Sequence, residues 1–136
     1  MLLHKDGLIE LNYEVATDIL TVCWPDMTGF TRSEIGYALQ KLIDTLKHYD
    51  IKKLLIDARS RVVELPEEEY ADLMLDFSRN LLSTRLMKVA RLQTLDMSRE
   101  KKVERATAKV EKQVQIDIPY KSFADEVSAL AWLRED

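Results

Sequence analysis

The sequence contains few of the residues on which recognisable metal, redox and phosphate sites are built. It has one cysteine, two histidines and three glycines among its 136 residues. A single cysteine excludes an intrachain disulfide, and two widely separated histidines do not provide the ligand spacing of a zinc site. The glycines are isolated from one another, so no glycine-rich phosphate loop is present. The sequence therefore predicts no metal, no bound cofactor and no phosphate-binding loop.

Long apolar runs and an excess of basic charge are also missing. No uninterrupted apolar segment approaches the roughly 20 residues of a membrane span, and the polar segment 4–6 comes too early for a signal peptide. We therefore expect a cytoplasmic protein without an integral membrane segment. The formal net charge is −4, from 24 acidic and 20 basic residues. Because general nucleic-acid binding needs a surplus of lysine and arginine, we expect no nucleic-acid partner.

Hydrophobic periodicity predicts a single α/β domain with a five-stranded mixed sheet and four helices. Residues 8–15 alternate as a strand with one wet face, and residues 53–57 are apolar on both faces, as in a central parallel strand. The predicted order is strand 8–15, strand 19–24, helix 31–49, strand 53–57, a helix from Pro66, strand 87–93, helix 99–112, strand 114–118 and helix 122–134. Right-handed crossovers make successive strands parallel. This ββαβαβαβα order therefore predicts a sheet that is antiparallel only at its first strand.

Capping residues and apolar stripes support the four helices. Thr31 and Glu34 have the spacing of a capping box, and Pro66 is expected at a first helical position. Ser98 and Ser122 are expected to cap the last two helices. The residues of the last helix that we expect to face the core are Phe123, Val127, Leu130 and Ala131, with Leu133 at the margin. The helix over 99–112 has few apolar residues, so we expect it to be held least firmly.

The loops that follow the parallel strands are the expected position of a site, because ligands of open α/β sheets bind beyond the carboxyl ends of the strands. These loops are rich in large apolar side chains and also carry arginines and hydroxyl groups. The candidate residues for binding a ligand or partner are Trp24, Met27, Phe30, Asp57, Arg59, Ser60, Arg61 and Met97. Two interpretations stay open: these residues form a groove for a small ligand or partner, or they close the top of the hydrophobic core.

Catalytic arrangements are missing from the same loops. His4 and His48 are expected elsewhere, so neither a Ser-His-acid set nor a Cys-His set can be assembled. Asp57, Thr94 and Lys121 imitate the aspartate, hydroxyl and lysine of a response-regulator receiver. A receiver, however, has five strand–helix units and an acidic pair after its first strand, whereas this chain has four such units and a single aspartate there. We therefore expect no enzymatic activity.

Three segments resemble the SpoIIAA-like, STAS-type family: the hairpin ending in ILTVCW, the central strand KKLLIDAR and the final SFADEVSALAWLRED. The resemblance covers nearly the whole chain and implies one SpoIIAA-like domain over residues 1–136, similar in architecture to the lipid-binding CRAL-TRIO domain. It also implies a regulatory protein that is switched by phosphorylation of a serine at the start of the second helix. Ser60 is the nearest match to that phosphoacceptor, but no glycine follows it and Arg61 replaces a small residue.

Two classes of function are compatible with these observations. The first is a non-catalytic STAS-like regulatory module that binds a protein partner, or a second copy of itself, through the loop 58–65 and the second helix. An exposed Leu82 would favour this function. The alternative is a carrier or sensor of a small amphipathic ligand, such as an acyl group, held near the carboxyl ends of the strands with Arg59 or Arg61 on its acidic head. That function requires a cavity beneath Trp24 and Phe30.

Overall fold

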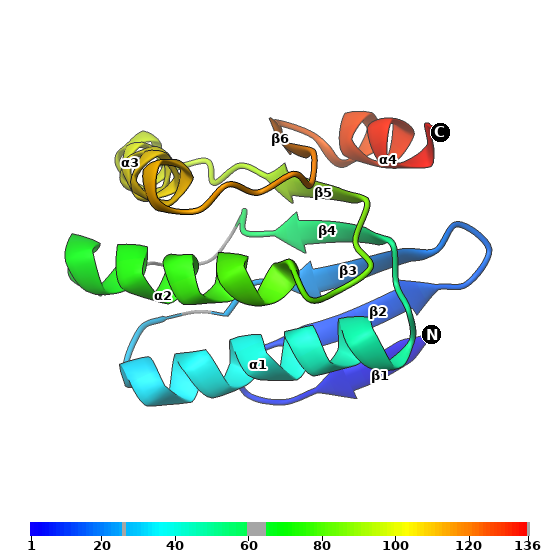
Figure 1. The fold of residues 1–136 in the computed structure, drawn as a ribbon, viewed down its shortest axis with the longest axis horizontal. Coiled ribbons are helices and arrows are strands. Elements are labelled where there is room, and N and C mark those ends of the chain that lie inside the picture. Colours follow the sequence, from blue (N-terminus) through cyan, green and yellow to red (C-terminus); the bar gives the residue numbers. More distant parts are fainter. Residues whose placement is uncertain (26, 60–64, 136) are drawn as a thin grey trace.

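The computed structural model describes residues 1–25, 27–59 and 65–135 of the chain. In this part of the chain, six strands form one sheet and four helices pack on its two faces (Figure 1). The elements are β1 (Leu2–Lys5), β2 (Glu10–Glu14), β3 (Ile19–Cys23), α1 (Arg32–His48), β4 (Lys53–Asp57), α2 (Glu67–Leu81), β5 (Lys88–Leu92), α3 (Met97–Gln113), β6 (Tyr120–Phe123) and α4 (Glu126–Arg134). The α/β class and the four predicted helices are therefore confirmed.

The strands lie in the sheet in the order in which they occur in the chain. β1, β2 and β3 form antiparallel pairs, and β3 through β6 form parallel pairs. The connections between the parallel strands run through α1, α2 and α3, which cover one face of the sheet, while α4 packs on the opposite face (Figure 1). The carboxyl ends of the parallel strands consequently meet at one edge, as the predicted crossovers require.

The prediction of five strands is wrong, because residues 2–5 add the edge strand β1. Its four residues are too short to show an alternating pattern, and it is held by tertiary contacts: the amino group of Met1 donates a hydrogen bond to the carbonyl of Tyr13 at 2.9 Å. The turn into β2 is closed by Asp6, whose carboxylate accepts hydrogen bonds from the amides of Leu8 and Ile9 at 2.7 and 2.9 Å. β2 is therefore antiparallel to both of its neighbours, and the sheet has two antiparallel pairings instead of one.

The predicted strand over 114–118 is also wrong, since the last strand is β6, two residues further on. The alternation of residues 114–118 is real, because the apolar positions are partly buried and the polar positions between them are exposed. Those apolar side chains, however, face a space between helices instead of a paired strand. Alternation thus reports an extended backbone with one apolar side, and it does not by itself show that the backbone is paired.

The helix starts are partly as expected. The capping box of Thr31 and Glu34 is present, and Pro66 stands at the N-cap, one residue before the first helical residue of α2. Ser98 and Ser122 are not caps: Asp96 caps α3, and Asp125 caps α4 by accepting the amide of Ser128. An aspartate carboxylate satisfies the first-turn amides as well as a serine hydroxyl does, so the aspartate that directly precedes each helix takes this position.

Two hydrophobic clusters lie on the two faces of the sheet. The larger contains the inward residues of α1 and α2, two buried residues of α3 and alternate residues of the strands, whereas the smaller lies beneath α4. Ala129 and Leu133 are fully buried in the smaller cluster, and Phe123 and Leu130 pack against it. Val127, which was expected to face the core, is 80% exposed. The predicted stripe was drawn from Phe123, which belongs to β6 and not to the helix, whereas the buried residues of α4 are Ala129 and Leu133, four residues apart.

Replacing Leu133 by alanine tests this assignment of the buried face. Leu133 has no exposed surface, so Leu133→Ala should lower the free energy of unfolding by about 2–5 kcal/mol through lost contacts and a cavity. Val127→Ala is the matched control and should change it by less than about 0.5 kcal/mol, as for other exposed positions. Urea denaturation followed by circular dichroism measures both variants. Equal losses for the two would contradict the observed orientation of α4.

Candidate functional site

The predicted site residues at the strand ends do not form one cluster, because they lie on opposite faces of the sheet. Trp24 and Met27 are 5% and 1% exposed and belong to the larger cluster, on the face covered by α1, α2 and α3. Trp24 packs edge-to-face on Phe77 of α2, with ring centroids 5.5 Å apart. Asp57 and Arg59 lie on the α4 face, where Arg59 reaches Glu126 at 3.7 Å. Successive residues of a strand point to opposite faces of the sheet. Side chains at the ends of neighbouring strands can therefore lie on different faces, as they do here.

Arg59 forms a two-pronged ion pair with Asp57. Its Nε and Nη2 donate to Oδ1 and Oδ2 of Asp57 at 3.1 and 3.0 Å, and its backbone amide donates to Oδ1 at 3.2 Å. Hydrogen bonding to Asp57 raises the pKa of Arg59 above its usual value, with a smaller contribution from Glu126. The charge of Arg59 is therefore compensated by two carboxylates, and the side chain joins the end of β4 to the first turn of α4.

The remaining predicted residues are dispersed. Phe30 is half-buried against the larger cluster, whereas Met97 is 69% exposed at the first residue of α3. Ser60, the predicted phosphoacceptor, and Arg61 lie outside the described residues. The space enclosed beneath the strand ends, around Trp24 and Ala58, is only about 10 Å³, which is about the room of a single water. Among the described residues, the strand-end positions Trp24 and Met27 therefore close the top of the core.

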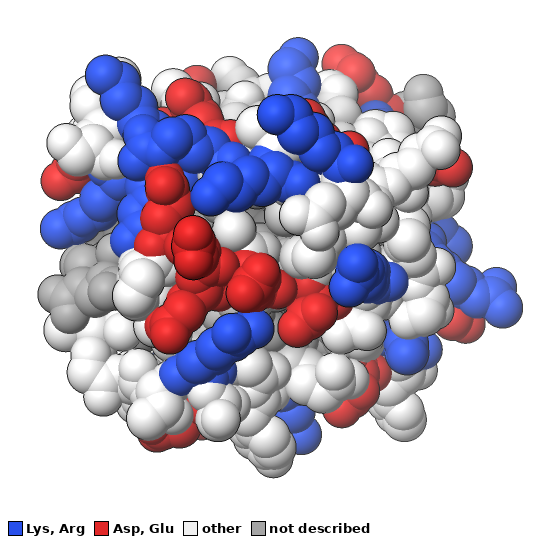
Figure 2. Space-filling view, turned by 60° about the vertical axis from the view of Figure 1, so that its left-hand side comes forward, with Lys and Arg blue, Asp and Glu red and all other residues white. Residues whose placement is uncertain are grey.

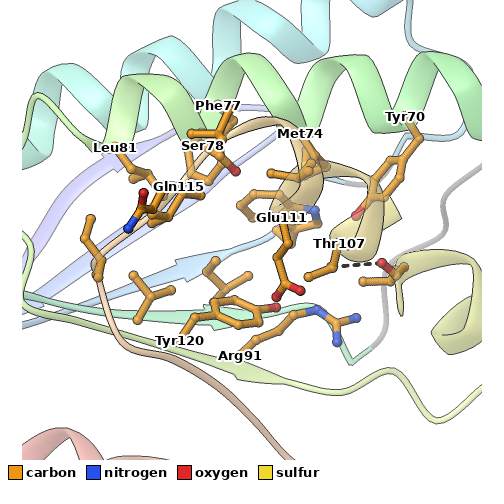
Figure 3. A pocket seen from close by; sticks show the side chains of 18 residues that line it. Tyr70, Met74, Phe77, Ser78, Leu81, Arg91, Thr107, Glu111, Gln115 and Tyr120 are labelled. Atoms are coloured by element: carbon orange, nitrogen blue, oxygen red, sulfur yellow. Dashed lines mark hydrogen bonds between the residues drawn. The ribbon is translucent and has the colours of Figure 1, made fainter. Parts of the chain in front are cut away.

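A larger cavity, of about 480 Å³, lies between α2, α3 and the sheet (Figure 3). Its lining residues come from both helices, from the strands β4 to β6 and from the segment that follows α3. They are Trp24, Ile56, Tyr70, Met74, Phe77, Ser78, Leu81, Val89, Arg91, Val103, Thr107, Val110, Glu111, Val114, Gln115, Ile116, Ile118 and Tyr120. Only Trp24 among them was a predicted site residue.

The sequence of α3 and of the segment after it explains why a cavity exists there. The apolar residues that α3 buries are Val103, Ala106 and Val110, whose side chains are short. Such residues hold the helix above the sheet without filling the space beneath it. Val114, Ile116 and Ile118 then continue the apolar wall along the extended segment. The alternation read as a strand from the sequence is therefore the signal for one wall of this cavity.

A buried ion pair lies at the polar end of the cavity, where Arg91 is part of the lining and Glu100 lies behind it. Arg91 points from β5 toward α3, and its Nη1 and Nη2 donate to the two carboxylate oxygens of Glu100 at 2.8 and 3.0 Å. Each of the two residues is 6% exposed, and the amide of Thr94 donates a further hydrogen bond to Glu100. Burial acts to lower the pKa of Arg91, but the hydrogen bonds with Glu100 and the electrostatic interactions with Tyr120, Glu100 and Tyr70 together outweigh it, and the pKa is raised. The guanidinium is thus permanently charged and balanced by one carboxylate.

Two tyrosines stand beside this pair. Tyr70 of α2 is 3% exposed and lines the cavity, and in Figure 3 its hydroxyl points into that space. Tyr120 lies across the cavity on β6 and is 44% exposed. Burial raises the pKa of both phenols, and Arg91 opposes the shift in each case. Both hydroxyl groups consequently remain protonated at neutral pH and can donate hydrogen bonds.

Charge complementarity holds α3 over the cavity. Arg105 of α3 pairs with Glu67 of α2, and this hydrogen bond lowers the pKa of Glu67. Lys102 donates a hydrogen bond to the carbonyl of Leu65, just before α2. Figure 2 shows a band of acidic side chains below a group of basic ones on the side of the molecule where α2 and α3 lie. The basic face of α3 therefore serves at least partly to bind its own neighbour.

Sequence reasoning missed the Arg91–Glu100 pair, although a signal was present. Arg91 is a charged residue inside the apolar strand 87–93, where a cation needs a buried partner. Glu100 lies in the first turn of the next helix, where a negative charge is favourable by itself. Its presence there can therefore be explained without a buried partner. The sequence contains several acidic residues at such positions. Only the crossing of α3 above β5 identifies which carboxylate faces the arginine.

Removing Glu100 tests how much the protein's stability depends on this pair. Glu100→Ala leaves the guanidinium of Arg91 buried without compensation, so the free energy of unfolding should fall by about 3–5 kcal/mol. Glu67→Ala, which breaks the exposed pair with Arg105, is the matched control and should have a much smaller effect. Chemical denaturation measures both variants. A stability of Glu100→Ala close to that of the unmodified protein would show that the pair is not buried as described.

The described residues contain neither a metal-binding cluster nor a membrane-spanning helix. No group of three or more histidine, cysteine, aspartate or glutamate side chains in this part of the chain is arranged to hold a metal ion. Among the helices that the structure describes, none is both long and apolar enough to cross a membrane. Comparisons with protein-family models, curated proteins and solved structures found no match to the chain. The geometry of the cavity is thus the basis for the proposed function.

Proposed function

We propose that the protein binds a small, largely apolar ligand in the cavity between α2, α3 and the sheet, as a carrier or a sensor. The volume of about 480 Å³ lies within the range of roughly 300–1,000 Å³ that is usual for small-molecule sites. Most of the lining is aliphatic or aromatic; Glu111 and Tyr120 lie near Arg91, whereas Ser78 and Gln115 lie toward the other end of the cavity (Figure 3). This combination of an apolar wall with a few placed polar groups is typical of ligand sites.

The observation that carries the proposal is the hydroxyl of Tyr70. The hydroxyl opens into the cavity, and among the described residues the one buried side-chain polar atom without a hydrogen-bond partner is Oγ1 of Thr17, so the Tyr70 hydroxyl is accessible from the cavity. A phenol is a hydrogen-bond donor. A ligand with a hydrogen-bond-accepting atom at this end of the cavity would accept a hydrogen bond from it. A phenylalanine at this position would fill the same space without offering a donor.

The proposed role is binding without catalysis. The described lining residues include neither histidine nor cysteine, and the hydroxyl of Thr107 donates to the carbonyl of Val103 at 2.9 Å. The two histidines lie in β1 and at the end of α1. The lining therefore offers no nucleophile paired with a base. The proposal keeps the ligand class of the alternative drawn from the sequence but not its position. The cavity that this alternative required beneath Trp24 and Phe30 is not found in the described part of the chain, because the space around Trp24 and Ala58 is about 10 Å³ and Phe30 does not line the larger cavity.

Blocking the cavity tests this function. Nile red, an uncharged apolar dye, should increase its fluorescence on binding to the unmodified protein. Ser78→Trp places an indole in the lining from α2 and should weaken dye binding by about tenfold or more, because the indole occupies the volume of the ligand. A titration of dye fluorescence at constant protein concentration gives the affinity.

Ser33→Trp is the control for this experiment, because Ser33 is exposed on α1 and does not line the cavity. It should leave dye binding unchanged. Circular dichroism establishes that both variants are folded. If Ser78→Trp bound the dye as well as Ser33→Trp does, the dye would be bound elsewhere and the proposed site would be wrong.

A second candidate function is the STAS-like interaction module, with a protein partner or a second copy of the chain bound through α2 and the loop before it. The observation that favours it is Leu82, which is 48% exposed at the end of α2. Met87, a short distance along the chain, is 60% exposed. Exposed apolar side chains at such a position are common in interfaces. Part of the loop 58–65 lies outside the described residues, so this candidate function is argued from α2 alone.

The self-association form of this candidate is tested by Leu82→Asp. If copies associate through α2, a buried aspartate at the interface should shift the protein toward monomer, with a loss of affinity of about tenfold or more. Tyr37→Asp is the control, because Tyr37 is 72% exposed on α1. Sedimentation velocity over a range of concentrations measures the oligomeric state. A monomeric unmodified protein would remove the homodimer and leave only a different protein as the partner.

A further inference from the structure

The Arg91–Glu100 ion pair at the polar end of the cavity carries no net charge. Both terminal nitrogens of Arg91 are engaged by Glu100, and the backbone amide of Thr94 occupies one of the same carboxylate oxygens. A ligand carboxylate at this end would have to displace Glu100 from Arg91, or lie beside a second carboxylate in a poorly solvated space. Either arrangement is unfavourable, because a buried anion without its own compensating charge is costly. A ligand ammonium would meet the guanidinium of Arg91 at the same place.

The rest of the lining reinforces the selection against an anionic head. Glu111 is the other ionisable acid or base in the described lining apart from the tyrosines, and in Figure 3 its carboxylate points toward Tyr120 and Arg91. The basic side chains that bind α2, those of Lys102 and Arg105, are not part of the lining. An anionic ligand therefore finds no uncompensated cation in the cavity. The basic group visible on the surface in Figure 2 does not change this, because it lies outside the cavity lining.

The tyrosines supply the opposite preference. The hydroxyl of Tyr70 points into the cavity, and that of Tyr120 faces the same space from β6 (Figure 3). A phenol is a strong hydrogen-bond donor and remains uncharged here. An alcohol, ester, ketone or amide oxygen accepts such a hydrogen bond and brings no charge into the cavity. This is the chemistry that satisfies Tyr70 without disturbing Arg91 and Glu100.

We infer that the ligand is an uncharged amphipathic molecule, whose apolar body lies along α2 and the segment 114–118 and whose head bears a hydrogen-bond-accepting oxygen that contacts Tyr70. This inference rests on the proposed function and specifies the chemical class of its ligand. It replaces the acidic head that the sequence suggested, because the arginine at the cavity is Arg91, already paired with Glu100, and not Arg59.

Three ligands with the same tail and different heads test the inference: decanol, decanoate and decylamine. Isothermal titration calorimetry at pH 7 gives the affinity of the unmodified protein for each. Decanol should bind at least about tenfold more tightly than either charged compound. A charged head loses its hydration on binding and gains no ion pair in the cavity, whereas the hydroxyl of decanol carries no charge. Tyr70→Phe should weaken decanol binding about fivefold by removing one hydrogen bond. Tyr37→Phe, at an exposed position of α1, should leave it unchanged.

Glu100→Gln tests the electrostatic cause. With the carboxylate replaced by an amide, Arg91 has an uncompensated charge, and the preference should move toward decanoate. If this variant does not fold, the ranking on the unmodified protein decides the question alone. Decanoate or decylamine binding as tightly as decanol, with binding lost in Ser78→Trp, would overturn the uncharged head and leave the proposed function standing. No binding of any of the three would overturn both.

Discussion

The buried ion pair between Arg91 and Glu100 determines the arrangement on which the cavity depends. It joins the carboxyl-terminal part of β5 to the first turn of α3, and the amide of Thr94 ties the intervening loop to the same carboxylate. A buried pair of this kind contributes more to specificity of arrangement than to stability, since its desolvation is costly. Here it selects one position of α3 above the sheet. The polar end of the cavity is a consequence of that position.

The rest of α3 is held by weak and largely electrostatic contacts. Its buried apolar residues are short, and its contacts with α2 include the Arg105–Glu67 pair and the hydrogen bond of Lys102 to Leu65. Exposed ion pairs contribute little individually and are screened by salt. A helix attached in this way can lie across an unfilled space, whereas a helix with leucine or phenylalanine in its inward stripe would fill it. The low apolar content of α3 and the existence of the cavity therefore have the same origin.

The two faces of the sheet serve different purposes. On the face of α1, α2 and α3, Trp24 and Phe77 close the top of the core, and the cavity lies below. On the other face, Asp57 and Arg59 join the end of β4 to α4. A site that used Trp24 and Arg59 together would have to pass through the sheet. The carboxyl edge of the sheet, where ligands of many α/β proteins bind, is in its described part occupied by structural contacts.

Local sequence determined those features that depend on neighbouring residues. The period of Ile35, Leu39 and Leu42 specified α1, and Thr31 with Glu34 specified its start. The apolar run Leu54-Leu55-Ile56 specified a strand buried on both faces. Even the alternation of residues 114–118 gave the correct side of the chain that is buried, because an extended backbone exposes alternate residues whether or not it is paired.

Tertiary structure decided which of these elements meet. The edge strand β1 forms only because β2 offers it an unpaired side, and four residues are too few to carry a period. Tyr70, Arg91 and Tyr120 come from α2, β5 and β6, and nothing in their spacing along the chain indicates that they share one cavity. Glu100 was one of several acidic residues at helix starts, and only the path of α3 across β5 made it the partner of Arg91. Contacts between residues far apart in the chain depend on how helices lie on the sheet, which no local pattern encodes.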